Sequence, residues 1–220
     1  DVKTQFTIVA DNIFGSSGPW PVAIGPQDGQ ADERLSHIIF ERNRIHPDYG
    51  TQSVTTVQVA LIVWARHCTI RNNIIDGTGA NRYFDGMVVD RRGIEPAPTN
   101  VEIYHNTIYR GDNVSVTPTA IQIGAVVTDS EARNNLASFP YASGPVTLVE
   151  DLSGVLARSN NLLTDDARFV LPGAADPLAR DYRLQAGSPA LGQGASVPVF
   201  DDFFMNFRPA SSADLGALEQ

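Results

Sequence analysis

Apolar and polar residues alternate along this chain over short stretches, and one such stretch recurs. In Cys68 to Ile75, apolar side chains at every second position lead into a polar pair that ends in asparagine, and a short apolar run follows. Aligning the chain with itself places matching asparagines at Asn43, Asn73, Asn106, Asn135 and Asn160. Their numbers differ by 30, 33, 29 and 25 residues. A period of this size is typical of a solenoid built from stacked coils.

The residue columns of the repeat predict which side chains face inward. The positions three before each asparagine are Phe40, Ile70, Ile103, Ala132 and Ala157, which we expect to point into the coil. The positions two before are Glu41, Arg71, Tyr104, Arg133 and Arg158, which we expect to point out. This period of two is that of a β-strand, and no window shows the three-to-four spacing of an amphipathic helix.

Each repeat also has an upstream apolar strand. These strands are expected at 21–24, 57–63, 86–89, 120–123 and 146–149. Three short strands per turn, each stacked on its equivalent in the next turn, describe a parallel β-helix. The recurring asparagines are then expected to bond backbone groups at a tight turn and the neighbouring asparagine, in a conformation that asparagine tolerates. In the first coil, either Asp11 or Asn12 fills this position.

The repeat resembles the right-handed parallel β-helix of the pectate-lyase-like superfamily, which includes polysaccharide lyases, mannuronan epimerases, some glycoside hydrolases and phage tailspikes. The resemblance covers roughly residues 6 to 164. It implies an all-β, right-handed parallel β-helix of about six coils over residues 1–164, followed by an irregular C-terminal cap over residues 165–220. A fold of this kind does not by itself define an activity.

The C-terminal segment carries a second resemblance. Asp181-Tyr182-Arg183-Leu184, Gly187-Ser188-Pro189-Ala190, Arg208-Pro209 and Asp214 to Glu219 are similar to the segment that follows the repeat in many secreted bacterial β-helix proteins. The resemblance implies a secreted, periplasmic or cell-surface bacterial protein. It fails at 203–206, where the family usually has an Asp-Gly turn. We expect this segment to cover the apolar end of the last coil with Leu184, Leu191, Phe200, Phe203 and Leu215.

Composition narrows the possible partners. The 220 residues carry a net charge of -9, with 42% hydrophobic and 19% charged residues. This balance is ordinary for one soluble domain and argues against nucleic acid, which requires a basic face. No run of apolar residues is long enough to span a membrane.

The only cysteine, Cys68, falls on an inward column and is expected to be buried. Because the repeat begins abruptly, we expect either a C-terminal part of a longer protein or a protein partner that covers the first coil.

Candidate chemistry lies on the loops that border the upstream strands, where variable loops would wall a groove over a rigid floor. The predicted catalytic residues are Asp85, Asp90, Arg91 and Arg92. The predicted substrate-binding residues are Trp64, Arg66, His67, Tyr83, Gln27 and Asp28. Cleavage of a uronic-acid polymer needs a cation for the substrate carboxylate, a base and an acid. Arginine suits the first role, whereas a hydrolase would need two carboxylates about 5 to 9.5 Å apart.

Two histidines fall in one column of the repeat. His37 and His67 each lie six residues before an asparagine, and Asn100 and Asp129 follow in the same column. The two rings are expected to stack at one corner, either as a polar surface stack or as a metal edge or proton relay. The sequence predicts no defined metal site. Calcium is the one cofactor that the resemblance implies, because many β-helix lyases use it.

Two functions follow from this reading. The first is a secreted β-helix that binds an acidic polysaccharide in the groove along the first-strand sheet, with lyase or, second to that, glycoside hydrolase activity left open. The alternative is a non-catalytic structural or interaction subunit of an extracellular or cell-surface assembly.

Overall fold

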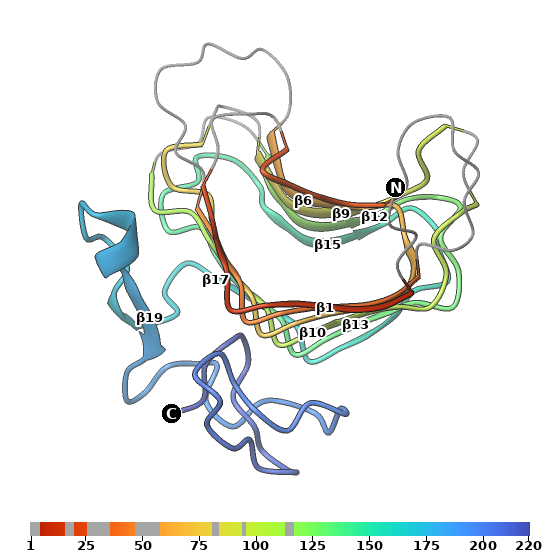
Figure 1. Cartoon of the computed structure of the whole chain (residues 1–220). Helices are drawn as coiled ribbons and strands as arrows, with labels where there is room; N and C mark the ends of the chain where they lie inside the picture. The colour runs from red at the N-terminus through yellow and green to blue at the C-terminus, as the bar shows by residue number, and fades with distance from the viewer. Residues whose placement is uncertain are drawn as a thin grey trace.

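The fold was described from a computed structural model. The structure describes residues 5–15, 20–25, 36–46, 58–80, 84–93, 96–112 and 117–220. Tyr83, Gln27 and Asp28, three of the predicted binding residues, lie outside these ranges. The predicted parallel β-helix is confirmed by three parallel sheets that enclose one core (Figure 1).

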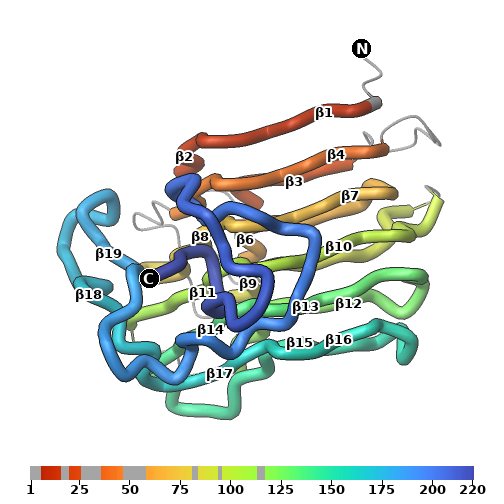
Figure 2. Tube along the Cα trace, turned by 90° about the horizontal axis from the view of Figure 1, so that it is seen from below, coloured from red at the N-terminus to blue at the C-terminus, as the bar shows by residue number. Residues whose placement is uncertain are grey.

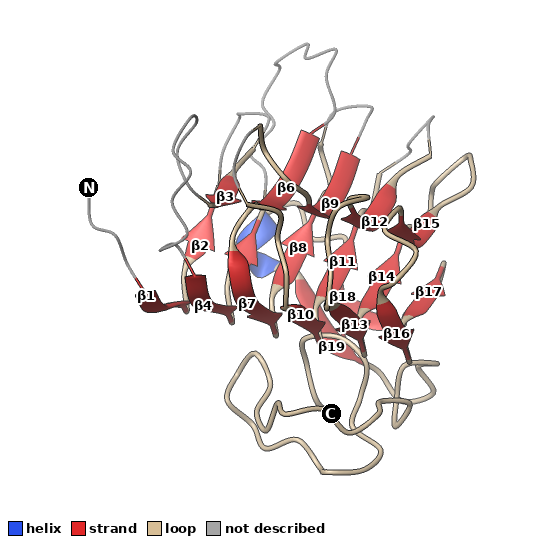
Figure 3. Cartoon of the chain, turned by 90° about the vertical axis from the view of Figure 1, so that its right-hand side faces the viewer, coloured by secondary structure: helices blue, strands red, loops and turns tan. Residues whose placement is uncertain are grey.

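The three sheets are built from strands that succeed one another around each coil (Figure 3). Sheet A contains β1 (Gln5–Ala10), β4 (Ser36–Glu41), β7 (Arg66–Arg71), β10 (Val101–Tyr104), β13 (Glu131–Arg133) and β16 (Ala157–Ser159). Sheet B contains β2 (Ile13–Phe14), β5 (Arg44–Ile45), β8 (Ile74–Asp76), β11 (Thr107–Tyr109), β14 (Leu136–Ser138) and β17 (Leu162–Thr164). Sheet C, the predicted upstream strands, contains β3 (Val22–Ile24), β6 (Gln58–Val63), β9 (Phe84–Val89), β12 (Thr119–Ile123) and β15 (Thr147–Asp151).

The coils are right-handed. In Figure 1 the chain runs clockwise from β1 through β2 to β3. Figure 2, seen from below, shows the coils stacked in chain order with β1 at the top, so that in Figure 1 the later coils lie further from the viewer. We expected about six coils, and the solenoid has about four turns. Sheets A and B each hold six strands, but the two outer strands of each are edges, so four strands have a neighbour on both sides.

An asparagine ladder runs along the turn between sheets A and B. The amide nitrogen of Asn73 donates to the carbonyl oxygens of Phe40 and Arg71 at 2.9 and 3.0 Å, and to Oδ1 of Asn106 at 2.9 Å. The Asn106 Oδ1 also accepts the backbone N–H of Asn73 at 3.1 Å. Asn12 donates to Asn43 Oδ1 at 3.0 Å, which settles the position in the first coil in favour of Asn12. The ladder thus satisfies backbone groups that a tight turn leaves unpaired inside the coil.

The last step of the ladder was predicted wrongly at Asn160. Asn135 donates to Oδ1 of Asn161 at 2.9 Å, and Asn161 donates to the Ala132 carbonyl at 2.7 Å. The register therefore moves by one residue in this coil, and Arg158 pairs with Ala132. Because a shift of one residue exchanges the two faces of a strand, Arg158 takes the inward column predicted for Ala157.

The left-handed conformation belongs to the residue before each ladder asparagine. In this column Asp11, Arg42, Asn72, His105, Asn134 and Asn160 have φ of 61°, 51°, 54°, 52°, 60° and 52°. We refer to these six residues as the corner column. Only two of the coils use a residue other than Asn or Asp here, although these two types are the most tolerant of positive φ. The sharp turn between sheets A and B is therefore made by the corner column, and the ladder asparagines stabilise it from inside.

The C-terminal segment lies along this corner (Figure 2). Side chains of the corner column reach it in turn, through bonds from Asn72 to the Asp201 carbonyl (2.9 Å), from His105 to Asp214 (3.1 Å), from Asn134 to Ala195 (2.7 Å) and from Asn160 to Gln193 (2.9 Å). The segment contains β18 (Phe169–Leu171) and β19 (Asp181–Leu184), which pair antiparallel, and the short 3-10 helix η1 (Pro177–Ala179). It therefore binds the side of the solenoid across several coils.

Arg208 and Gly216 hold the end of this segment in place. The guanidinium of Arg208 is buried and donates to the carbonyls of Asp201, Asp214 and Gly216 and to the Glu219 carboxylate. Gly216 has φ of 86°, and a Cβ there would lie 2.5 Å from Thr107 Oγ1. Glycine is thus required where the segment crosses the outer face of sheet B.

The expectation that this segment caps the last coil was wrong in its placement. Leu184 and Leu215 are buried against Ile74 and Leu136 on the outer face of sheet B, with Leu191 and Phe203 packed beside them, while Phe200 is 69% exposed. The outer face of sheet B carries an apolar stripe that the segment covers, so burial favours the side of the solenoid over its end.

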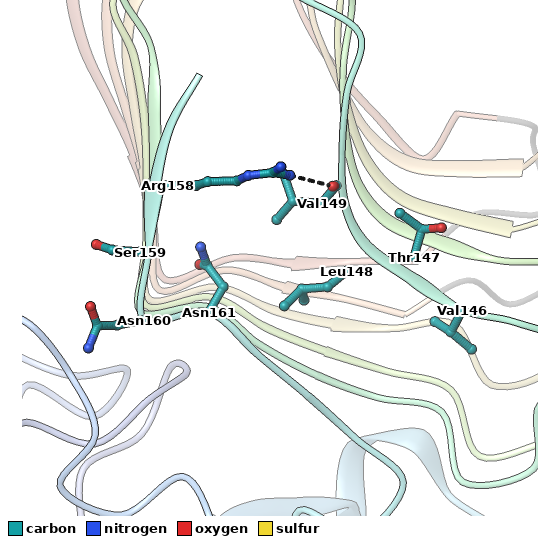
Figure 4. A pocket seen from close by; sticks show the side chains of 8 residues that line it. All are labelled: Val146, Thr147, Leu148, Val149, Arg158, Ser159, Asn160 and Asn161. Carbon is teal, nitrogen blue, oxygen red and sulfur yellow. Dashed lines mark hydrogen bonds between the residues drawn. The ribbon is translucent and has the colours of Figure 1, made fainter. Parts of the chain in front are cut away.

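Figure 4 shows the last coil, where Arg158 Nη1 donates to the Val149 carbonyl at 3.1 Å beside a cavity of about 430 Å³.

Candidate functional site

The outer face of sheet C carries the described residues of the predicted catalytic set. In the middle of its strands two successive residues point inward, as in Ala60-Leu61 and Ala120-Ile121, and the register of the pairing skips the first of each pair. Small side chains at this position allow the bend; in β9 the residue is Gly86, where a Cβ would lie 2.6 Å from the Ala120 carbonyl oxygen. The strands consequently curve, and sheet C is concave towards the outside (Figure 1).

Two tryptophans and an arginine gather on this face. Trp64 directly follows β6 and packs with Val59, Ile62 and Val88 in a small cluster separate from the main core. The ring of Trp20, 46% exposed, meets it edge-on at 6.0 Å between centroids. The Arg92 guanidinium lies 4.3 Å from the Trp64 ring centroid and 5.5 Å from that of Trp20. Together they place a cation and an exposed aromatic surface side by side.

Asp85 is a carboxyl group on this face whose pKa is raised above its ordinary value. It lies in β9 between Val59 and Thr119 of the adjoining strands, and its Oδ1 accepts the Thr119 N–H at 3.3 Å. Burial raises the pKa of Asp85 to about 6, the Thr119 N–H opposes that rise, and the negative charge of Glu150 adds to it. A carboxyl with a pKa near neutrality exchanges a proton readily at physiological pH.

Asp90 and Arg91 stand at the end of the same strand. Asp90 Oδ1 accepts the Arg91 N–H at 2.7 Å, and the carboxylate packs against Gly124, where a Cβ would lie 2.1 Å from Oδ1. Asp85 and Asp90 are five residues apart, and a strand rises about 3.3 Å per residue, so their Cα atoms are about 16 Å apart before the bend is counted. This spacing exceeds that of the carboxylate pair of a glycosidase.

The predicted pair Arg66 and His67 belongs elsewhere. Both open β7 in sheet A and not sheet C. The expected histidine stack is present, with the His37 and His67 rings 4.9 Å apart and 11° from parallel. His67 Nδ1 also lies 3.2 Å from the Asn100 amide. His37, His67, Asn100 and Asp129 all have positive φ, as does Phe6, so this column marks a second left-handed corner of the coil. The left-handed turn at this corner therefore explains why the His37 and His67 rings stack.

The sequence did not single out two residues of the sheet C face. Gln122 Nε2 donates to Glu150 Oε2 at 2.6 Å on the outward column that also contains Val88. The period of two along β12 and β15 was the signal that placed both side chains outward. They extend the polar part of the face towards the last coil.

A metal is not supported by the residues that the structure describes. Among them no group of three His, Cys, Asp or Glu side chains is arranged to hold an ion. The carboxylates on sheet C are spread along the strand and do not fit the calcium implied by the resemblance, so no step is assigned to it. Within the described ranges, no helix is long and apolar enough to cross a membrane.

The three parallel sheets and the asparagine ladder define the chain as a parallel β-helix protein. No family profile, curated protein or solved structure matches the chain. The class of protein therefore rests on the sheets and the ladder alone, and membership of the pectate-lyase-like superfamily stays a prediction.

Proposed function

We propose that the protein binds an acidic polysaccharide across the concave outer face of sheet C. The observation that carries this proposal is the Arg92 guanidinium held over Trp64 beside the exposed Trp20. Sugar rings stack on exposed aromatic faces, and arginine binds carboxylates through paired N–H groups. The strands repeat about every 4.8 Å along the face, which suits an extended polymer lying across the coils.

Cleavage by β-elimination is the catalytic form of this proposal. Asp85 would take the C5 proton of the uronic acid and return it to the glycosidic oxygen as the bond to that oxygen breaks and the double bond forms, since its raised pKa lets it serve as base and then as acid near neutrality. Arg91 and Arg92, six and seven residues further along the chain, would bind the carboxylates of other sugar units of the same polymer. A lyase is favoured over a glycoside hydrolase because Asp85 and Asp90 are too far apart along β9 to flank one bond. A polysaccharide-active relative of the pectate-lyase-like superfamily, secreted, periplasmic or at the cell surface, is the setting that fits this role.

Binding is tested by affinity electrophoresis in gels containing polygalacturonate, alginate or chondroitin sulfate. We expect at least one polymer to retard the protein, and Trp20→Ala and Arg92→Ala each to weaken that retardation about tenfold, the effect of about 1.4 kcal/mol. Phe207→Ala is the matched control, because Phe207 is an exposed aromatic residue of the C-terminal segment, beside His105 and away from sheet C. No retardation by any polymer, or equal loss in the control, would refute the proposal.

Cleavage is tested separately, by following the absorbance of the unsaturated product with the same polymers, with and without calcium. The wild-type protein should produce it, and Asp85→Asn should not. A flat trace alongside normal retardation would leave binding and exclude the lyase.

The alternative, a structural or interaction subunit, is favoured by the first described coil. Phe6 and Ile8 on the edge strand β1 are 76% and 63% exposed. A protein partner that covers this coil would bury them and pair the strand edge. Cross-linking followed by mass spectrometry should then join β1 to that partner, and absence of any cross-link there in the native extract would contradict this role.

A further inference from the structure

A second cavity lies on a different side of the solenoid, over the outer face of sheet B. Its floor is formed by Tyr109 and Ser138, which are neighbours in register at the ends of β11 and β14. The C-terminal segment forms one wall through residues 165–169 and 185–186, and Pro140 and Tyr141 form another. The cavity has a volume of about 510 Å³, within the range of small-molecule sites.

The floor presents the hydroxyl groups of two side chains, Tyr109 and Ser138. Tyr109 is 4% exposed and Ser138 is 2% exposed. Both residues line the cavity. Burial raises the pKa of Tyr109 to about 12, helped by the nearby Asp76 carboxylate, so its O–H is a donor throughout the physiological range. A hydroxyl group both donates and accepts, so the pair is suited to a ligand that itself carries hydroxyl groups.

The walls and rim indicate the chemistry of that ligand. Tyr141 lines the cavity and is 60% exposed, while Phe169 packs edge-on against Tyr109 at 5.8 Å between ring centroids. The rim carries Asp165 and Asp166, which accept hydrogen bonds, and Arg168, which lies 4.0 Å from the Asp166 carboxylate. Aromatic faces combined with hydroxyl and carboxylate groups match the apolar faces and the hydroxyls of a sugar. Two carboxylates against one guanidinium disfavour an acidic sugar.

We propose that this cavity binds one neutral pyranose residue, with Tyr109 and Ser138 bonding its hydroxyls and Tyr141 stacking on its ring. This sugar site goes beyond the proposed function, since it uses sheet B and the C-terminal segment, and it does not depend on sheet C. A solenoid with both sites would hold a neutral branch or end of a glycan separately from an acidic chain.

The test uses saturation-transfer NMR of the full chain. The probes are the methyl glycosides of glucose, galactose, mannose and N-acetylglucosamine, and the methyl glycoside of galacturonic acid with its carboxyl group free. We expect transfer to at least one neutral glycoside. Tyr141→Ala should weaken that binding about tenfold, and Tyr109→Phe and Ser138→Ala about fivefold each, because each removes one hydrogen bond. Circular dichroism verifies that the three variants are folded. Trp20→Ala tests whether the sugar binds on sheet C instead, and Phe207→Ala, at an exposed aromatic residue outside this cavity, is the matched control that should bind like the wild-type protein.

Three results would overturn the proposal: no transfer to any neutral glycoside, tighter binding of galacturonic acid than of galactose, or transfer unchanged in the folded Tyr109→Phe and Ser138→Ala variants. Loss in Trp20→Ala without loss in Tyr141→Ala would also overturn it, because the sugar would then bind on sheet C. Failure of polymer retardation leaves this test unaffected, so the two proposals fail separately.

Discussion

Removing one rung of the asparagine ladder should destabilise the whole solenoid. The Asn106 amide donates to the carbonyls of Ile70 (2.9 Å) and Tyr104 (3.1 Å) and to Oδ1 of Asn135 (3.0 Å). Its oxygen accepts from the backbone and the amide of Asn73. Asn106 is fully buried, so in Asn106→Ala these five partners lose a bond with no water to replace it. The three bonds that the Asn106 amide donates share two N–H groups, so they count as about two bonds. Together with the two bonds that its oxygen accepts, and at about 1 kcal/mol per bond, the loss is about 4 kcal/mol.

Urea unfolding measures this loss. Against a total stability of roughly 5–15 kcal/mol and a slope of about 2 kcal/mol per molar urea, the midpoint of Asn106→Ala should fall by about 2 M. Two matched variants test the corrected register. Asn161→Ala, at the last rung, should cost about 2 kcal/mol, and Asn160→Asp, which keeps a residue tolerant of positive φ and removes the one bond from the exposed amide to Gln193, less than about 1 kcal/mol. A loss below about 1 kcal/mol for Asn106→Ala, or equal losses at 160 and 161, would refute the reasoning.

Three further predictions concern charged groups. Burial lowers the pKa of His105 to about 3, and the positive charge of Arg208 adds to that effect. The neutral imidazole therefore contributes its full stability above about pH 6.5, and this stability is lost as the pH falls towards 3. Acid unfolding of His105→Gln should occur at lower pH than that of the wild-type protein, and an unchanged midpoint would contradict this. Because burial raises the pKa of Asp85 to about 6, its ionisation costs stability as the pH rises through 6, so Asp85→Asn should raise the melting temperature at pH 8 and leave it unchanged at pH 4. Arg208→Lys should free the C-terminal segment to limited proteolysis, at a cost of roughly 3 kcal/mol, since lysine cannot reach the same set of acceptors; equal resistance in both proteins would argue against this role.

The candidate site was predictable to the extent that the repeat places loops beside the upstream strands. Asp85 and Asp90 were placed at the two ends of one such strand, and the loop positions brought Trp64 and Arg92 to the same sheet. The ring contacts among Trp20, Trp64 and Arg92 depend on how neighbouring coils stack, which one strand cannot show. Arg66 and His67 were grouped with this site by their closeness in sequence. A corner separates them from it, because the chain turns into sheet A directly after Trp64.

The sequence by itself determined the kind of fold. Inward columns such as Phe40, Ile70 and Ile103 recur with the asparagines, and a β-strand has only two faces, so the repeat fixed the three sheets and the ladder. Only the tertiary structure decided the register of the last coil and the course of the C-terminal segment. Either of two adjacent asparagines satisfies the local pattern, and the choice depends on the coil that Asn161 bonds to. The segment follows the corner column because Asn72, His105 and Asn134 bond it there, and those contacts exist only once the coils are stacked.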